Sequence, residues 1–106
     1  MSLPPLSPEA RAAALEKAAR ARKERAEVKA SLKAGKTNLP DVIREGATDD
    51  IIGKIKVVSL LEAVPGVGKV RARQIMTRLG IAETRRVRGL GHNQRQALEA
   101  EFPVAA

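Results

Sequence analysis

The stretch VPGVGKVRARQI, from Val64 to Ile75, decides how this chain folds. Its proline stops any helix that precedes it, and two glycines then surround a single valine. One lysine and two arginines follow within five residues, and the apolar residues resume helical spacing. The stretch therefore predicts a hairpin of two helices, the second running from Lys69 to Leu79 and ended by Gly80.

The paired glycines point to a phosphate contact. A turn between two helices needs at most one glycine for its own geometry, so the second suggests that something approaches the backbone. The first N–H groups of the following helix have no intrahelical acceptor, and the helix dipole adds partial positive charge there. Such an end binds anions, and neither Gly66 nor Gly68 has a Cβ that would keep a phosphate away. Val67, between them, is expected to point inward.

One other interpretation of the hairpin stays open at this point. An ordinary packed turn explains the glycines equally well if the basic residues are there by chance. A nucleotide-binding loop does not, because the GxxxxGK[ST] spacing is absent and no strand precedes the motif. The later stretch TRRVRGLG, from Thr84 to Gly91, favours a phosphate contact, since it adds three arginines in four residues and two glycines that let a loop lie flat on a surface.

Composition limits both the core and the range of partners. The chain has 106 residues and a single aromatic residue, Phe102, so its core must be small and built from Leu, Ile and Val. It carries 20 basic and 12 acidic residues, a net charge of +8, with the surplus divided between residues 1–34 and 58–106. This charge favours a polyanion, above all nucleic acid. An anionic membrane surface is the alternative, but the basic segments lack the bulky apolar face that inserts into one.

Several classes of protein are excluded by what the sequence lacks. Without cysteine there is no disulfide or thiolate chemistry, and no apolar run approaches the ~20 residues of a membrane span. His92 has no carboxylate or nucleophile near it in sequence, and Asp49 and Asp50 read as acids at a helix start. We therefore expect a soluble cytoplasmic protein with no catalytic residue, no metal site and no cofactor, which is not an enzyme.

Helical signals divide the chain into three parts. Residues 1–6 form a proline-containing tail, residues 7–34 one long helix, and residues 35–106 a compact domain. In the long helix Ser7 is the expected N-cap, and a stripe of alanines ends in Val28 and Leu32, so we expect its last two turns to pack on the domain. Its many charges fit either a solvated helix or an arm laid along a phosphate backbone.

The domain is expected to contain only short helices. One helix ends near Glu45, and the next runs from Asp49 to about Lys54. Another begins at a capping box formed by Ser59 and Glu62, and the last runs from Gln94 to Glu101. No strand pattern occurs, so the predicted fold is all-α. The residues expected to face the core are Leu39, Val42, Ile43, Ile51, Ile52, Ile55, Val70, Ile75, Met76 and Leu79.

The stretch LLEAVPGVGKVRARQIMTRLGIAETRRVRGLG resembles the helix–two-turns–helix module of some DNA glycosylases, of type II B topoisomerases and of a small-subunit ribosomal protein. With the opening LPPLSPEARAAALEKAA and the junction LKAGKTNL, nearly the whole chain resembles one family, the actinobacterial integration host factor. The resemblance implies a nucleoid-associated protein that binds double-stranded DNA across the minor groove with little sequence preference. It also implies DNA bending or compaction, and partnership with phage integrase–DNA complexes in site-specific recombination.

The resemblance also assigns residues to the interface. It implies a monomer in the nucleoid whose hairpin grips one strand while a lid around residues 82–94 reaches the other. The binding turn comprises Pro65, Gly66, Val67, Gly68, Lys69, Val70 and Arg71. The lid comprises Arg85, Arg86, Arg88, Gly89, Gly91, Asn93 and Gln94, with Arg73, Lys54 and Lys56 as additional candidates. A ribosomal-protein-like RNA-binding module is the alternative, although the long basic C-terminal tail of that relative is missing.

Overall fold

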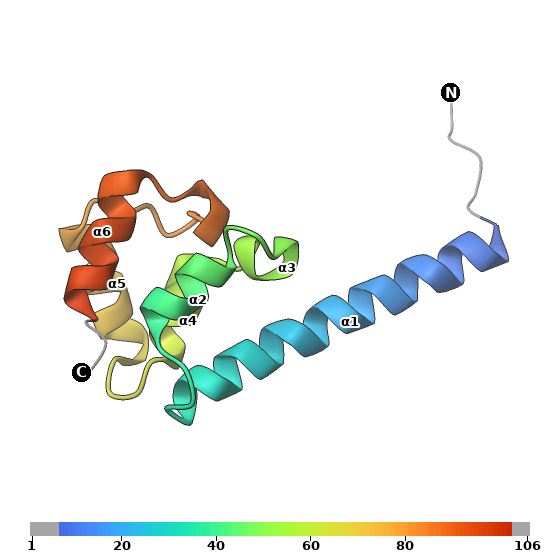
Figure 1. Ribbon diagram of the computed structural model, residues 1–106, viewed down its shortest axis with the longest axis horizontal. Helices are drawn as coiled ribbons and strands as arrows, with labels where there is room; N and C mark the ends of the chain where they lie inside the picture. The colour runs from blue at the N-terminus through green and yellow to red at the C-terminus, as the bar shows by residue number, and fades with distance from the viewer. Residues whose placement is uncertain (1–6, 103–106) are drawn as a thin grey trace.

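The computed structural model describes residues 7–102, and within them the chain is all helical, as predicted. Figure 1 shows a long helix that leaves a compact group of short helices. An isolated antiparallel bridge between Lys56 and Arg86 is the one piece of extended pairing in this part of the chain. The elements are α1 (Pro8–Lys33), α2 (Leu39–Glu45), α3 (Asp50–Gly53), α4 (Val57–Ala63), α5 (Gly68–Arg78), the 3-10 turn η1 (Val87–Gly89) and α6 (His92–Glu101). The predicted tail at residues 1–6 lies outside the described residues.

Helix α1 begins at the residue that its sequence indicates, and its N-terminal half extends into solvent. The Ser7 hydroxyl accepts a hydrogen bond from the Ala10 N–H at 3.1 Å, and Pro8 is the first helical residue. Residues 7–20 are all exposed, and half-buried positions begin at Ala21. About three and a half turns therefore contact the body, not the two predicted, because α1 packs against α3 as well as against α4.

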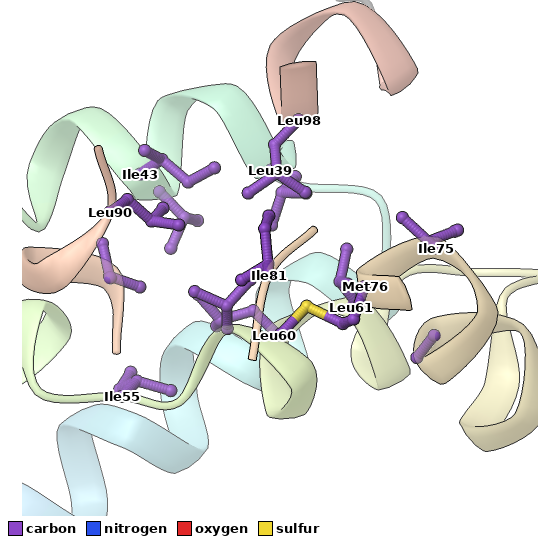
Figure 2. Packing of buried hydrophobic residues seen from close by; sticks show 14 of the residues in the cluster. Leu39, Ile43, Ile55, Leu60, Leu61, Ile75, Met76, Ile81, Leu90 and Leu98 are labelled. Carbon is purple, nitrogen blue, oxygen red and sulfur yellow. The ribbon is translucent and has the colours of Figure 1, made fainter. Parts of the chain in front are cut away.

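The core is an aliphatic cluster shared by all the short helices and the end of α1. Figure 2 shows Leu39 and Ile43 of α2 close to Leu98 of α6, with Ile81, Leu60 and Met76 below them. Of the predicted core residues, Ile51 is half-buried, whereas its neighbour Ile52 is fully inside. The buried side chains are Leu32, Leu39, Val42, Ile43, Ile52, Ile55, Val57, Leu60, Leu61, Ala72, Ile75, Met76, Ile81, Val87, Leu90 and Leu98.

Helix α4 begins two residues before the predicted capping box. Ser59 is its third residue, so the Ser59–Glu62 prediction was wrong. The Val57 N–H instead donates to the carbonyl of Arg85, 3.0 Å away, and no side chain caps this end. A tertiary partner has taken the place of the local cap, which no sequence pattern within α4 could indicate.

Helix α5 turns its apolar face toward α4, with one exception to the prediction. Ala72, Ile75 and Met76 are buried, but Val70 is 72% exposed. Val70 lies two residues before Ala72, which places it about 200° away around the helix. Helical periodicity therefore puts Val70 on the outer face, and its assignment to the core was wrong.

Candidate nucleic-acid interface

The α4–α5 hairpin has two glycines in the left-handed region. Gly66 has φ +81° and Gly68 φ +72°. The turn itself therefore requires both glycines, and the expectation that one would suffice was wrong. A Cβ at either position would meet nothing within 4 Å, so the backbone here is also open to solvent. Both reasons for glycine, conformation and access, apply at once.

The N-terminal end of α5, unlike those of α1, α2 and α3, has no side-chain cap. Ser7, Asn38 and Asp49 each accept hydrogen bonds at the starts of those three helices. At α5 the N-cap is Val67, whose side chain is half-buried against the core, as predicted. Within residues 7–102 the first three N–H groups of α5 have no acceptor, so they remain available to an anion.

Positive side chains surround this helix end. Lys69 and Arg71 are exposed, and neither takes part in the ion pairs found within residues 7–102. Arg73, one of the additional candidates, lies further along α5 and pairs with Glu83 at 3.6 Å. Free positive charge is therefore concentrated at the first turn of α5, beside the open backbone.

The predicted lid is a segment anchored to the body. Two backbone hydrogen bonds of 3.0 Å hold it against the start of α4, one from Val57 N–H to the Arg85 carbonyl and one from Val87 N–H to the Ile55 carbonyl. The side chains of Val87 and Leu90 are buried in the core. Its backbone is therefore fixed, and the arginines between these anchors are held at the surface.

All three lid arginines already contact protein groups. Arg85 donates to the Gly89 carbonyl at 3.0 Å, Arg86 donates to the Lys54 carbonyl at 2.6 Å, and Arg88 pairs with Asp50. Each guanidinium has five N–H donors, so these contacts orient the side chains and leave donors for a ligand. Together with the Lys54 side chain they line a hollow of about 480 Å³.

Gly53 of α3 lies close both to the end of α2 and to the lid, a role that the sequence did not reveal. A Cβ on Gly53 would lie 2.7 Å from the Gly46 carbonyl oxygen and 3.3 Å from the Arg88 Cβ. The residue was interpreted only as part of a short helix. The sequence around Gly53 does not indicate this role, because the contact with Arg88 joins segments that are far apart in the chain.

Among the remaining candidates, Gln94 has a structural role, whereas Asn93 and Lys56 are exposed. The Gln94 side chain accepts from the Gly91 N–H at 3.0 Å and donates to the Gly80 carbonyl at 3.4 Å, so it is occupied in capping α6. Helix α6 begins at His92, two residues before the prediction. Asn93 is exposed, as is Lys56 at the N-cap of α4.

The turn and the lid lie at opposite ends of α4. The lid pairs with the segment at its start, and the glycine turn follows its end (Figure 1). Seven residues of helix span about 10 Å. The turn and the lid are therefore separated by the length of this helix.

Two carboxylates outside the interface have shifted pKa values. A hydrogen bond from Arg78 is the main cause that lowers the pKa of Glu101. Partial burial raises the pKa of Glu24, and the nearby negative charge of Asp49 raises it further. No three His, Cys, Asp or Glu side chains among residues 7–102 are grouped so that they could hold a metal ion. None of the helices in this range has the length and hydropathy to cross a bilayer.

The chain is similar to known proteins over nearly its whole length. Residues 32–102 match the family described as S13-like H2TH domain. The chain is 67% identical to "Integration host factor" of Streptomyces coelicolor over 102 residues, covering 96% of this chain and 95% of that protein. It is 59% identical to the protein of the same name from Mycobacterium tuberculosis over 105 residues, covering 99% of this chain and 100% of that one.

A solved structure is similar over most of its length. It is the structure of sIHF bound to an 8bp palindromic DNA, with a TM-score of 0.81 and 64% identity, covering 82% of this chain and 98% of that chain. The sequence matches span both the long helix and the hairpin domain. The chain therefore belongs to the integration host factor family, and its residues 32–102 form an S13-like H2TH domain.

Proposed function

We propose that this protein binds double-stranded DNA as a nucleoid-associated protein, holding phosphates at both edges of a minor groove. The uncapped start of α5, exposed beside two left-handed glycines, is the observation that carries the proposal. It supplies main-chain N–H donors to one strand. The arginines of the lid, at the opposite end of α4, supply side-chain donors to the other strand.

Weak sequence preference follows from this chemistry. Phosphate contacts position a protein on DNA without reading bases. The chain has a single aromatic residue, so it has no platform on which unpaired bases could stack. Bending or compaction of the duplex and assistance to integrase–DNA complexes are the roles that the family name suggests. They are proposed for a monomer that carries no cofactor, catalyses no reaction and resides in the nucleoid.

The RNA-binding alternative rests only on the H2TH domain. The relatives that match over nearly the whole chain are named integration host factor, and the similar solved structure is bound to DNA. Duplex DNA is therefore the favoured ligand. Competition between a labelled DNA duplex and an unlabelled A-form RNA duplex tests this, and stronger competition by RNA would reverse the assignment.

The direct test measures DNA affinity against salt. If about six phosphates are neutralised, log K falls with log salt at a slope near −5. Replacing Arg85, Arg86 and Arg88 together with alanine should reduce that slope by about 2 to 3 units and leave the helical content unchanged. A slope near zero for the unmodified protein, or an unaltered slope for the variant, contradicts the proposal.

A further inference from the structure

We propose that the protonation state of Glu24 controls how closely α1 packs against α3, so that the long helix is docked more firmly in acid than at neutral pH. The inference goes beyond the proposed function, because it concerns the position of α1 in the free protein. It is carried by the acidic flank of α1, which lies away from the hairpin turn.

The docked part of α1 is held firmly at only one end. Leu32, near the C-terminus of the helix, is the one fully buried side chain of α1. Toward the N-terminus, Ala21, Glu24 and Val28 are only half-buried. Glu24 therefore lies where α1 is stabilised by the least burial of apolar surface. An unfavourable charge at this place can displace the helix while Leu32 stays in the core.

Glu24 faces a hollow whose charged groups all have the same sign. The hollow has a volume of about 330 Å³ and lies between α1, α2 and the start of α3. Besides Glu24 it is lined by Glu27 of α1, Glu45 at the end of α2 and Asp49 at the N-cap of α3. Its other lining residues are uncharged. An ionised Glu24 is therefore surrounded by like charges, which disfavour ionisation.

The basic side chains of the neighbouring elements do not neutralise this hollow. Arg25 of α1 and Lys54 at the end of α3 line a separate hollow with Asp50, and Arg44 of α2 pairs with Asp41. No ion pair within residues 7–102 includes Glu24. The charged residues on the flank of α1 that faces α4 and α5 line a third hollow, and they are Lys29, Lys33, Glu62 and Lys69.

One oxygen of Glu24 lacks a hydrogen-bond donor. Its Oε2 atom is buried and has no partner in the part of the chain that the structure describes. A buried charged oxygen without a donor is unfavourable. This burial, and then the charge of Asp49, raise the pKa of Glu24 above its ordinary 4.5.

Protonation turns the unpartnered oxygen of Glu24 into a donor, and Asp49 offers an acceptor in the same hollow. The Oδ1 atom of Asp49 accepts from the N–H groups of Ile51 and Ile52 at 2.8 and 3.1 Å, which leaves its Oδ2 atom to accept a bond from Glu24. Such a bond would join α1 to the N-terminal end of α3.

The direction of the pH effect follows from the raised pKa of Glu24. The docked state binds the proton more tightly than a state in which α1 has moved away and Glu24 is in water. Docking is therefore favoured below pH 4.5, and this contribution is lost as pH rises through the raised pKa of the docked state.

The test measures the position of α1 in the full chain without DNA. The chain has no cysteine, so Ala13→Cys and Asn93→Cys place two spin labels at exposed positions of α1 and α6 without changing any charge. Pulsed electron paramagnetic resonance gives the distribution of distances between the labels. The distribution should be narrow at pH 4.5 and broader at pH 7, while circular dichroism shows the same helical content at both pH values.

Two variants separate Glu24 from the general charge of the hollow. Glu24→Gln is neutral and keeps a donor, so its distribution should be narrow at both pH values. Its melting temperature should exceed that of the unmodified protein at pH 7 and match it below pH 4.5. Glu27→Gln removes the same charge from the same hollow and should keep the broadening.

A distribution that does not change with pH when Glu24 is present overturns the inference. Equal loss of the pH response in both variants does so as well. Neither result bears on the proposed function, because no DNA is present in these measurements.

Discussion

Replacing Gly68 with alanine separates the two reasons for the glycine in the turn. The residue has φ +72°, a conformation that costs an L-residue with a Cβ about 1–2 kcal/mol. A Cβ built there meets no atom within 4 Å, so no packing cost adds to the backbone strain. The free energy of unfolding should fall by that amount, and the melting temperature by about 4–8 °C for each kcal/mol.

DNA binding should weaken in the same variant for a different reason. The added methyl group projects into the open space beside the α5 N–H groups, where the phosphate is proposed to lie. Loss of one hydrogen bond to a charged group costs about 1.5–3 kcal/mol, which is a roughly 10- to 150-fold loss of affinity. Fluorescence anisotropy with a labelled duplex measures this change well below the melting temperature.

Gly35→Ala is the matched control. Gly35 follows α1 with φ +74°, and a Cβ there also meets nothing within 4 Å, but the residue lies in neither the turn nor the lid. It should lose the same stability and keep its DNA affinity. If both variants lose affinity equally, or if Gly68→Ala is destabilised yet binds normally, then the turn backbone does not contact phosphate.

Two further predictions concern ion pairs. Asp50→Asn should release Arg88 and remove a negative charge of α3 that lies beside the lid, so DNA affinity measured by anisotropy should rise severalfold. Stability should change by less than about 1 kcal/mol, because the pair is exposed. Weaker binding would mean that Asp50 positions Arg88 for its ligand. Glu101→Gln should lose the contribution of the pair with Arg78, whose hydrogen bond lowers the pKa of Glu101 below its ordinary 4.5. A carboxylate with a lowered folded pKa stabilises the protein above pH 4.5 and ceases to do so as pH falls through the folded value, so denaturant unfolding curves of the two proteins should differ at pH 7 and converge at low pH; a difference independent of pH would assign the effect to packing.

Local chemistry determined the parts of this protein that were predicted correctly. Ser7 caps α1, and Gly80 ends α5 with φ +70°, because caps and left-handed glycines act within a few residues of themselves. The glycine turn could be recognised from sequence for the same reason, and the resemblance to the family was identified from that turn. Even where prediction failed within an element, at Val70, helical periodicity would have placed the residue outside.

Tertiary contacts decided what lies between those elements. The start of α4 depends on a carbonyl 28 residues away, since Val57 is held by Arg85. Arg88 pairs with Asp50 only in the folded chain, where the lid packs close to Gly53 of α3. The two flanks of α1 line a basic and an acidic hollow only because α4 and α5 pack on one flank and α2 packs on the other. Periodicity places a residue on a face of its own helix, but which neighbour covers that face depends on how the whole core packs, and the charges that share a groove come from segments that meet only in the folded chain.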